Sequence, residues 1–101
     1  MSFAMALIVG ATGLAFGQDE TAKNAYLDTC AVCHGADGAG KTAKGKKLKV
    51  KDVRETVKKL TAEQMAEIVA KGKDPDMEGY AKQFKPDQIR AVVEYYRSLA
   101  K

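Results

Sequence analysis

The sequence predicts an all-α domain with about four helices and long loops. Apolar residues recur every three to four positions in several segments of the 101-residue chain, which is the period of an α-helix. Capping pairs or a proline stand at the start of three of these segments. No segment alternates apolar and polar residues in the strict way that predicts a half-buried strand.

The first 17 residues differ in composition from the remainder, because none of the charged side chains lies among them. Their apolar run has about the length of a secretory signal core, and Ala15 and Gly17 form a small-x-small cleavage pattern. We therefore expect residues 1–17 to be a signal peptide and residues 18–101 to form one exported, periplasmic domain. A retained membrane anchor and a part of the fold are the alternatives, although spanning a bilayer takes roughly 20 residues.

Residues 19–32 contain good helix formers and predict the first helix. Ala22, Tyr26 and Cys30 fall on one face of it, at helical spacing. Three glycines then end the helix and open a loop: Gly35, Gly38 and Gly40. Residues 41–51 carry six lysines and no apolar stripe, so we expect an exposed loop there.

Two capping patterns predict the next two helices. Asp52 with Glu55 marks the start of a short helix. Thr61 with Gln64 predicts a capping box at the start of the second helix, which Gly72 ends. The apolar faces are Val53, Val57 and Leu60 in the first helix and Met65, Ile68 and Val69 in the second.

The last helix is predicted to follow a loop. Residues 73–80 contain proline and glycine among polar residues, which is typical of a loop. Pro86 suits the first position of a helix, where its missing N–H has no intrahelical partner to lose. The apolar face of this helix consists of Ile89, Val92, Val93, Tyr96 and Leu99.

The two cysteines and the one histidine of the chain lie within five positions, in the motif CAVCH. Two thiols three positions apart near a helix end point in similar directions, and they can form thioethers with the two vinyl groups of one haem. Cys30 and Cys33 are therefore the predicted attachment residues of one haem c, and His34 is the predicted iron ligand beneath it. A large cofactor also explains how long loops are held in so small a domain.

Other uses of this motif are weaker alternatives. A structural zinc site needs four ligands, and the chain has only three Cys or His side chains. A dithiol oxidoreductase typically places C-x-x-C beside a βαβ unit, and no strand is predicted here. A disulfide is ordinary for two cysteines in an exported chain and competes with haem attachment.

The second axial ligand decides between an electron carrier and an enzyme, because a six-coordinate iron has no open position for a substrate. A methionine sulfur in that position raises the reduction potential. Met65 falls on the apolar stripe of a predicted helix, so core packing is its expected role. Met77 lies in a polar loop without a helical partner, and we predict it as the second metal ligand, opposite His34.

The sequence resembles class I single-haem c-type cytochromes, in particular small bacterial ones. The matching stretches are CAVCHGADGAGK, GYAKQF after Met77 and the closing VVEYYRSL. The resemblance spans nearly all of residues 18–101 and implies the cytochrome c fold, wrapped around one covalently attached haem. It also implies that the first and last helices cross closely, with Ala22 and Tyr26 meeting the region of Val92, Tyr95 and Tyr96.

Two positions depart from the family pattern. The ligand methionine of the family is often followed by proline, whereas Met77 is followed by Glu78. Many members also have a proline after the histidine, whose carbonyl orients the imidazole, and Ala43 stands in its place. We expect another backbone carbonyl to accept the imidazole proton of His34.

The sequence thus predicts a soluble electron carrier and not an enzyme, with no catalytic residue. Leu48, Val53, Ile68 and Tyr80 are expected to surround the haem and exclude water. The alternative is a haem protein in which Met77 is absent from the iron or easily displaced. Such a protein would bind a small ligand or have peroxidase-like activity.

The charge of the chain indicates its class of partner. The formal net charge is +4, and the lysines of residues 41–51 predict docking to redox proteins with acidic surfaces, such as an oxidase or a reductase. Nucleic acid is a poor match, because an exported chain rarely meets it and the aromatic residues do not interleave with the basic run. Membrane association is expected only if residues 1–17 are retained, and the expected state is a monomer.

Overall fold

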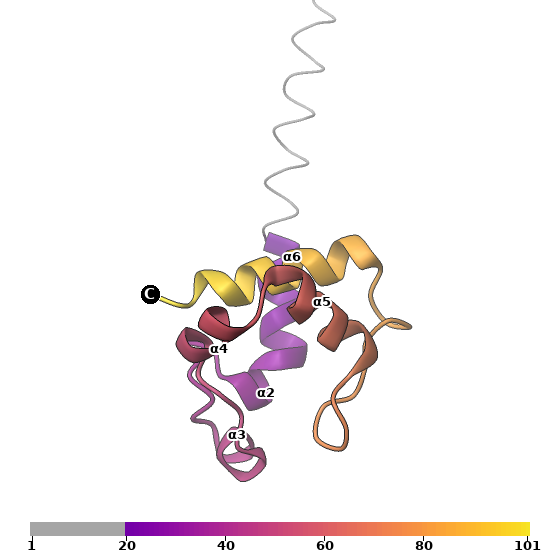
Figure 1. Cartoon of the computed structure of the whole chain (residues 1–101). Helices are drawn as coiled ribbons and strands as arrows, with labels where there is room; N and C mark the ends of the chain where they lie inside the picture. Colours follow the sequence, from indigo (N-terminus) through magenta and orange to yellow (C-terminus); the bar gives the residue numbers. More distant parts are fainter. Residues whose placement is uncertain (1–19) are drawn as a thin grey trace, which may run out of the picture.

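The computed structural model describes residues 20–101 and contains, within that range, five helices and no β-strand (Figure 1). The first helix spans residues 20–34, includes a π-helical turn, η1 (Tyr26–Cys30), and ends as α2 (Ala31–His34). The others are α3 (Ala43–Leu48), α4 (Val53–Lys59), α5 (Ala62–Lys71) and α6 (Pro86–Ser98). The all-α class is confirmed. The predicted signal peptide lies outside the described residues, and no helix within them is long and apolar enough to cross a bilayer.

The last helix crosses the first, as the resemblance implied. Figure 1 shows α6 passing across the N-terminal helix. Tyr26 lies at the crossing with 1% of its surface exposed, and its ring centroid is 5.3 Å from that of Tyr95 and 5.9 Å from that of Tyr96. Ala22, one turn earlier, is also buried. This contact fixes the helix that carries the cysteine motif against the C-terminal helix.

A second contact packs α5 against α6. Met65 on α5 and Ile89 and Val93 on α6 form a buried apolar cluster, which confirms the predicted core position of Met65. The predicted capping box is present: the Thr61 hydroxyl accepts the Gln64 N–H, and the Gln64 side chain accepts the Thr61 N–H. Both N–H groups would otherwise lack an intrahelical partner, so the box stabilises the start of α5.

The cap of α4 lies at the predicted residue but has a different partner. Asp52 Oδ1 accepts the backbone N–H of Arg54 at 2.9 Å, and Asp52 Oδ2 lies 2.7 Å from Nη2 of the same arginine. The hydrogen bonds from Arg54 lower the pKa of the Asp52 carboxyl to about 2. The reciprocal bond from the Asp52 N–H to the Glu55 side chain is absent from this helix start, and the backbone and guanidinium of Arg54 bind the Asp52 carboxylate.

The lysine-rich stretch forms the short helix α3, so its prediction as a loop is wrong. The Thr42 hydroxyl caps the start of α3 by accepting the Gly45 N–H at 2.9 Å, and Lys49 ends the helix with a left-handed backbone (φ 59°). The helix packs against the rest of the protein at Gly45 and has no apolar stripe. The approach is so close that a Cβ on Gly45 would overlap the Cys33 carbonyl oxygen. The side chains are exposed, as expected, at Lys41, Lys44, Lys46, Lys47, Lys49 and Lys51.

Replacing Tyr26 by phenylalanine is expected to lower the free energy of unfolding by about 0.5–1.5 kcal/mol, the net contribution of one hydrogen bond. The Tyr26 hydroxyl donates to the Gly35 carbonyl oxygen at 2.7 Å, and burial raises the tyrosine pKa well above its usual value, so the donor stays protonated. The variant removes the shorter of the two hydrogen bonds to this carbonyl and leaves the one from the Gly38 N–H at 3.1 Å. Urea unfolding measures the loss, and Tyr95→Phe at the same helix crossing is the control. An equal loss in both variants would contradict the role of the bond.

Candidate functional site

A cavity of about 960 Å³ is enclosed by the N-terminal helix, by α3 to α6 and by the loop after α5. Its size lies at the upper end of ligand-binding cavities in proteins. The described residues form only a small buried apolar core, and part of it lines the cavity: Ala22, Tyr26, Val53, Met65, Ile89, Val92 and Val93. A cavity this large relative to the buried core is big enough to hold a large bound group.

The cysteine motif forms one wall of the cavity. Cys30 ends the π-helical turn, Cys33 follows on α2, and both side chains are half-buried free thiols that line the cavity. Burial raises the pKa of the Cys30 thiol to about 11. Gly35 ends α2 with a positive φ of 85°, a conformation that glycine adopts without strain. The two thiols thus line the same cavity and are not joined as a disulfide.

His34 lies at the end of α2 and also lines the cavity. Its ring meets the edge of the Tyr96 ring at a centroid distance of 5.1 Å and an angle of 67°. Burial lowers the pKa of His34, which favours the neutral imidazole, the form that ligates metals.

The imidazole lacks the hydrogen bond that the sequence led us to expect. Within residues 20–101, His34 Nδ1 is buried and has no hydrogen-bond partner. Ala43, which stands in place of the proline of the family, is the first residue of α3, where the backbone carbonyls follow the helix axis. No backbone carbonyl of the described residues therefore accepts a hydrogen bond from His34 Nδ1, and this atom of the buried imidazole is left without a partner there.

Met77 reaches the same cavity from the loop after α5. Its backbone forms an isolated bridge with Lys73: the Lys73 N–H donates to the Met77 oxygen at 2.7 Å and the Met77 N–H donates to the Lys73 oxygen at 2.9 Å. Beyond Met77, the Tyr80 N–H donates to the Val69 oxygen at 2.8 Å. These bonds hold the Met77 loop to the C-terminal end of α5.

Two glycines allow this loop to close. A Cβ on Gly72 would lie 2.6 Å from the Gly79 nitrogen, and a Cβ on Gly79 would lie 2.7 Å from the Ala70 oxygen. Both distances are shorter than a real Cβ contact, so the two ends of the loop pass each other only because neither carries a side chain. We call this pair the glycine neck.

Glu78, in the position where the family often has proline, is exposed and lines the cavity. The Tyr80 hydroxyl donates to Glu78 Oε1 at 3.4 Å, a long hydrogen bond. The rigidity that a proline after the methionine would bring is replaced here by the backbone bonds to α5 and by the glycine neck.

The predicted apolar surroundings are mostly, but not entirely, in place. Leu48, Ile68 and Tyr80 line the cavity, and Met65 lines it as well as packing in the core. Val53 does not line it. Val53 is 1% exposed and packs beneath the loop that contains Gly35, Gly38 and Gly40. The start of α4 turns toward this loop, and the Val53 N–H donates to the Gly38 oxygen at 2.8 Å.

Thr42 is a residue that the sequence did not single out. Its hydroxyl donates to the Val32 oxygen at 2.7 Å while accepting the Gly45 N–H. One side chain therefore caps the start of α3 and pairs a carbonyl at the end of the cysteine-bearing helix, where carbonyls lack intrahelical partners. A threonine directly before a glycine-containing lysine run was the only signal for it.

Replacing Thr42 by valine is expected to lower the free energy of unfolding by about 1–2 kcal/mol, the range of a lost helix cap. Valine keeps the shape of the side chain but removes the hydrogen bonds of the hydroxyl to the Val32 and Cys33 oxygens and from the Gly45 N–H. Urea unfolding measures the loss, and amide hydrogen exchange in α3 should accelerate. Thr42→Ser restores the hydroxyl and should recover most of the stability. Exchange in α3 that is unchanged in the valine variant would show that the cap is dispensable.

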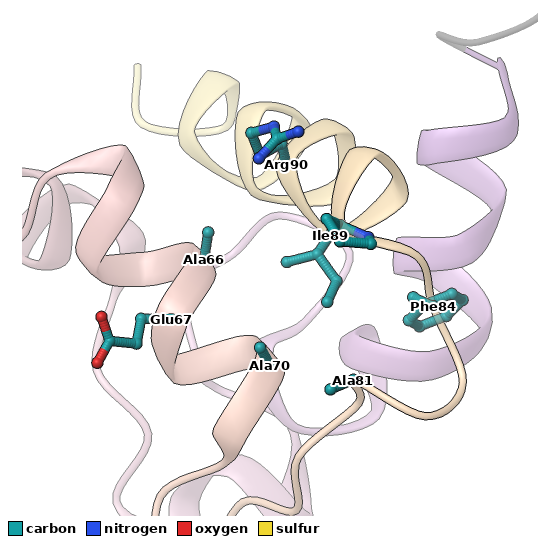
Figure 2. Close-up of a pocket in the computed structure, with 8 residues that line it drawn as sticks. Ala66, Glu67, Ala70, Ala81, Phe84, Ile89 and Arg90 are labelled. Carbon is teal, nitrogen blue, oxygen red and sulfur yellow. The ribbon is translucent and has the colours of Figure 1, made fainter.

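A second, smaller cavity of about 240 Å³ lies between α5 and the start of α6 (Figure 2). Ala66 and Ala70 on α5 point toward Ile89 on α6 in Figure 2, whereas the carboxylate of Glu67 extends away from them. None of the four predicted site residues lines it. The candidate site is therefore the large cavity.

The residues of the large cavity fit a c-type haem. Two free thiols stand beside a neutral imidazole, methionine sulfurs are available, and the volume accommodates a large apolar group. A zinc module fits poorly, because the described part of the chain contains no group of three or more Cys, His, Asp or Glu side chains arranged to hold a metal.

Comparison with known proteins agrees with this fit. The family described as cytochrome c oxidase, cbb3-type, subunit III matches residues 17–95. Among solved structures, the chain is similar to the KustC0563 c-type cytochrome, with a TM-score of 0.72 and 27% sequence identity, covering 78% of this chain and 96% of that chain. No curated protein matched. The family match spans most of the sequence, and the chain therefore belongs to the cbb3-type oxidase subunit III family, as a small c-type cytochrome with the cytochrome c fold.

Proposed function

We propose that the chain is an electron carrier in which Cys30 and Cys33 attach one haem c through two thioethers and His34 and Met77 bind its iron. The haem supplies a one-electron iron couple. The observation that supports this proposal is that both free thiols, the neutral imidazole and the Met77 side chain line one cavity of about 960 Å³.

The side chains of the cavity have separate tasks in this proposal. The thioethers keep the haem from dissociating. The Tyr96 ring limits rotation of the imidazole through its edge contact with His34. Leu48 and Ile68 exclude water, which favours a higher reduction potential. Two protein ligands on the iron leave no place for a substrate, and this favours electron transfer over catalysis.

The partners in this proposal are redox proteins of a respiratory chain, consistent with the oxidase subunit family that the sequence matches. The exposed lysines of residues 41–51 would steer an acidic oxidase or reductase surface toward the cavity. We further propose that residues 1–17 direct export and that the domain of residues 18–101 acts in the periplasm as a monomer.

Absorption spectroscopy and a redox titration test this function. The purified protein should show a c-type haem spectrum that survives acidic solvent extraction, because a thioether-bound haem cannot be extracted. A potentiometric titration should show one wave with a one-electron slope. Extraction of the haem would contradict attachment through Cys30 and Cys33. Ready binding of carbon monoxide by the ferrous protein would favour the alternative, in which Met77 is labile.

A further inference from the structure

The mouth of the large cavity has two edges of opposite charge. We define the lysine edge as Lys44, Lys49 and Lys51, and the acidic edge as Asp74, Asp76 and Glu78; all six line the cavity and are exposed. Lys73 also lines the cavity beside the acidic edge, and its positive charge reduces the negative charge there without cancelling it. Glu55 and Lys59 on α4 also line the cavity and offset each other.

Neither edge forms an ion pair within residues 20–101. The ion pairs of the described residues join Asp52 to Arg54 and, elsewhere, Glu67 to Lys71, Asp87 to Arg90 and Glu94 to Arg97. No lysine of the lysine edge and no carboxylate of the acidic edge takes part in them. Both edges therefore keep their full charge for interactions with another molecule.

The helix between the two edges carries an exposed apolar residue. Figure 1 shows α2 between α3 on one side and the loop after α5 on the other. Val32 lies on α2 between the two cysteines and lines the cavity, with 57% of its surface exposed. Within residues 20–101 the other exposed large apolar side chain is Leu27, at 38%. An apolar centre between charged edges is the arrangement of an interface core and its polar rim.

A uniformly acidic partner complements only half of this face, since it would attract the lysine edge and repel the acidic edge. A second copy of the chain complements both halves. When two copies face each other about a two-fold axis that runs between the edges, each lysine edge meets the acidic edge of the other copy. The two Val32 side chains then lie near the axis.

We propose that this face docks a second copy of the chain in a weak, two-fold symmetric complex. The proposal goes beyond the electron-carrier function, which concerns other redox proteins, and the complex is a transient encounter between two proteins that are each otherwise monomeric. The net charge of +4 opposes association at long range, so the complex is transient and forms through the local charge pattern. Raising the salt concentration from about 0.01 to 0.5 M screens the attraction between the opposite charges, so the complex should dissociate.

Charge reversal of one or both edges tests the proposal with net charge controlled. Lys44→Glu with Lys51→Glu reverses the lysine edge, and Asp74→Lys with Asp76→Lys reverses the acidic edge. Each substitution changes the charge by two, so the first pair lowers the net charge from +4 to 0 and the second raises it to +8. All four together return it to +4 and exchange the two edges, which leaves them complementary.

The measurement is the change in backbone amide shifts of the reduced, haem-loaded protein between dilute and millimolar solutions at low salt. We expect shifts at residues 44–51 and 74–78 in the wild type, loss of at least nine-tenths of them in each single-edge variant, and recovery in the four-fold variant. The absorption spectrum of every variant is recorded first. A wild-type spectrum without a c-type haem or without the methionine–iron band would count against the proposed function, whereas the docking face is judged by the shifts alone.

Three outcomes would overturn the docking face. The first is a wild type without concentration-dependent shifts at low salt. The second is a folded four-fold variant that fails to recover them. The third is shifts confined to another face, such as the small cavity of Figure 2. Because the salt titration of the wild type needs no substitution, the proposal is tested even if a variant does not fold.

Discussion

Replacing Met77 by alanine should abolish the weak far-red absorption band of a methionine–ferric-iron bond and lower the reduction potential. Alanine has no sulfur to donate to the iron, and methionine ligation is the arrangement that raises the potential of a haem. We expect a fall on the order of 0.1 V, within the roughly 0.8 V range over which axial ligands set haem potentials. The ferric spectrum and a potentiometric titration measure the two effects.

Met65 is the matched control, because its side chain lines the same cavity from α5. It is 4% exposed and packs with Ile89 and Val93, so Met65→Ala should lower the free energy of unfolding by about 2–5 kcal/mol while keeping the far-red band. The opposite pattern, with the band lost in Met65→Ala and kept in Met77→Ala, would assign the iron ligand to α5.

Features encoded by neighbouring residues were predictable from the sequence. The capping box of Thr61 and Gln64 and the start of α6 at Pro86 are local signals, and the structure has both where they were expected. The spacing of Cys30, Cys33 and His34 likewise needs only one helix end, so their common exposure to one cavity follows from the motif.

The helix α3 was missed because its stability comes from residues outside it. A helix is ordinarily recognised by its apolar stripe, but this one contacts the protein through Gly45, which packs on the Cys33 carbonyl. Its cap, Thr42, also bonds to the Val32 carbonyl ten residues earlier. A sequence pattern does not show which distant carbonyl a threonine will reach, so the same six lysines suggested a loop.

The acidic edge was missed for a related reason. Asp74 and Asp76 are ordinary loop residues in the sequence, and their opposition to the lysines appears only when the loop and α3 lie on either side of α2 (Figure 1). The absent proline after Met77 was visible in the sequence. What replaces it was not, because the bonds from the loop to Val69 and Ala70 depend on how the chain folds back on α5.

Replacing Gly79 by alanine should displace Met77 without changing any proposed ligand. The added Cβ would lie 2.7 Å from the Ala70 oxygen and 2.8 Å from the Lys71 oxygen, and these backbone atoms belong to the end of α5 and cannot move freely. The loop must then shift away from α5. We expect the free energy of unfolding to fall by about 1–3 kcal/mol, as for other overpacked sites, and the far-red band to weaken because the sulfur no longer stays at the iron.

Glu78→Ala separates this steric effect from a general sensitivity of the loop. Glu78 lies between Met77 and Gly79, is exposed, and accepts only a long hydrogen bond from Tyr80, so its loss should change the stability by no more than about 0.5 kcal/mol. The two variants are compared by urea unfolding and by the intensity of the far-red band. If Gly79→Ala kept both values while Glu78→Ala lost them, the carboxylate and not the glycine neck would hold Met77 in place.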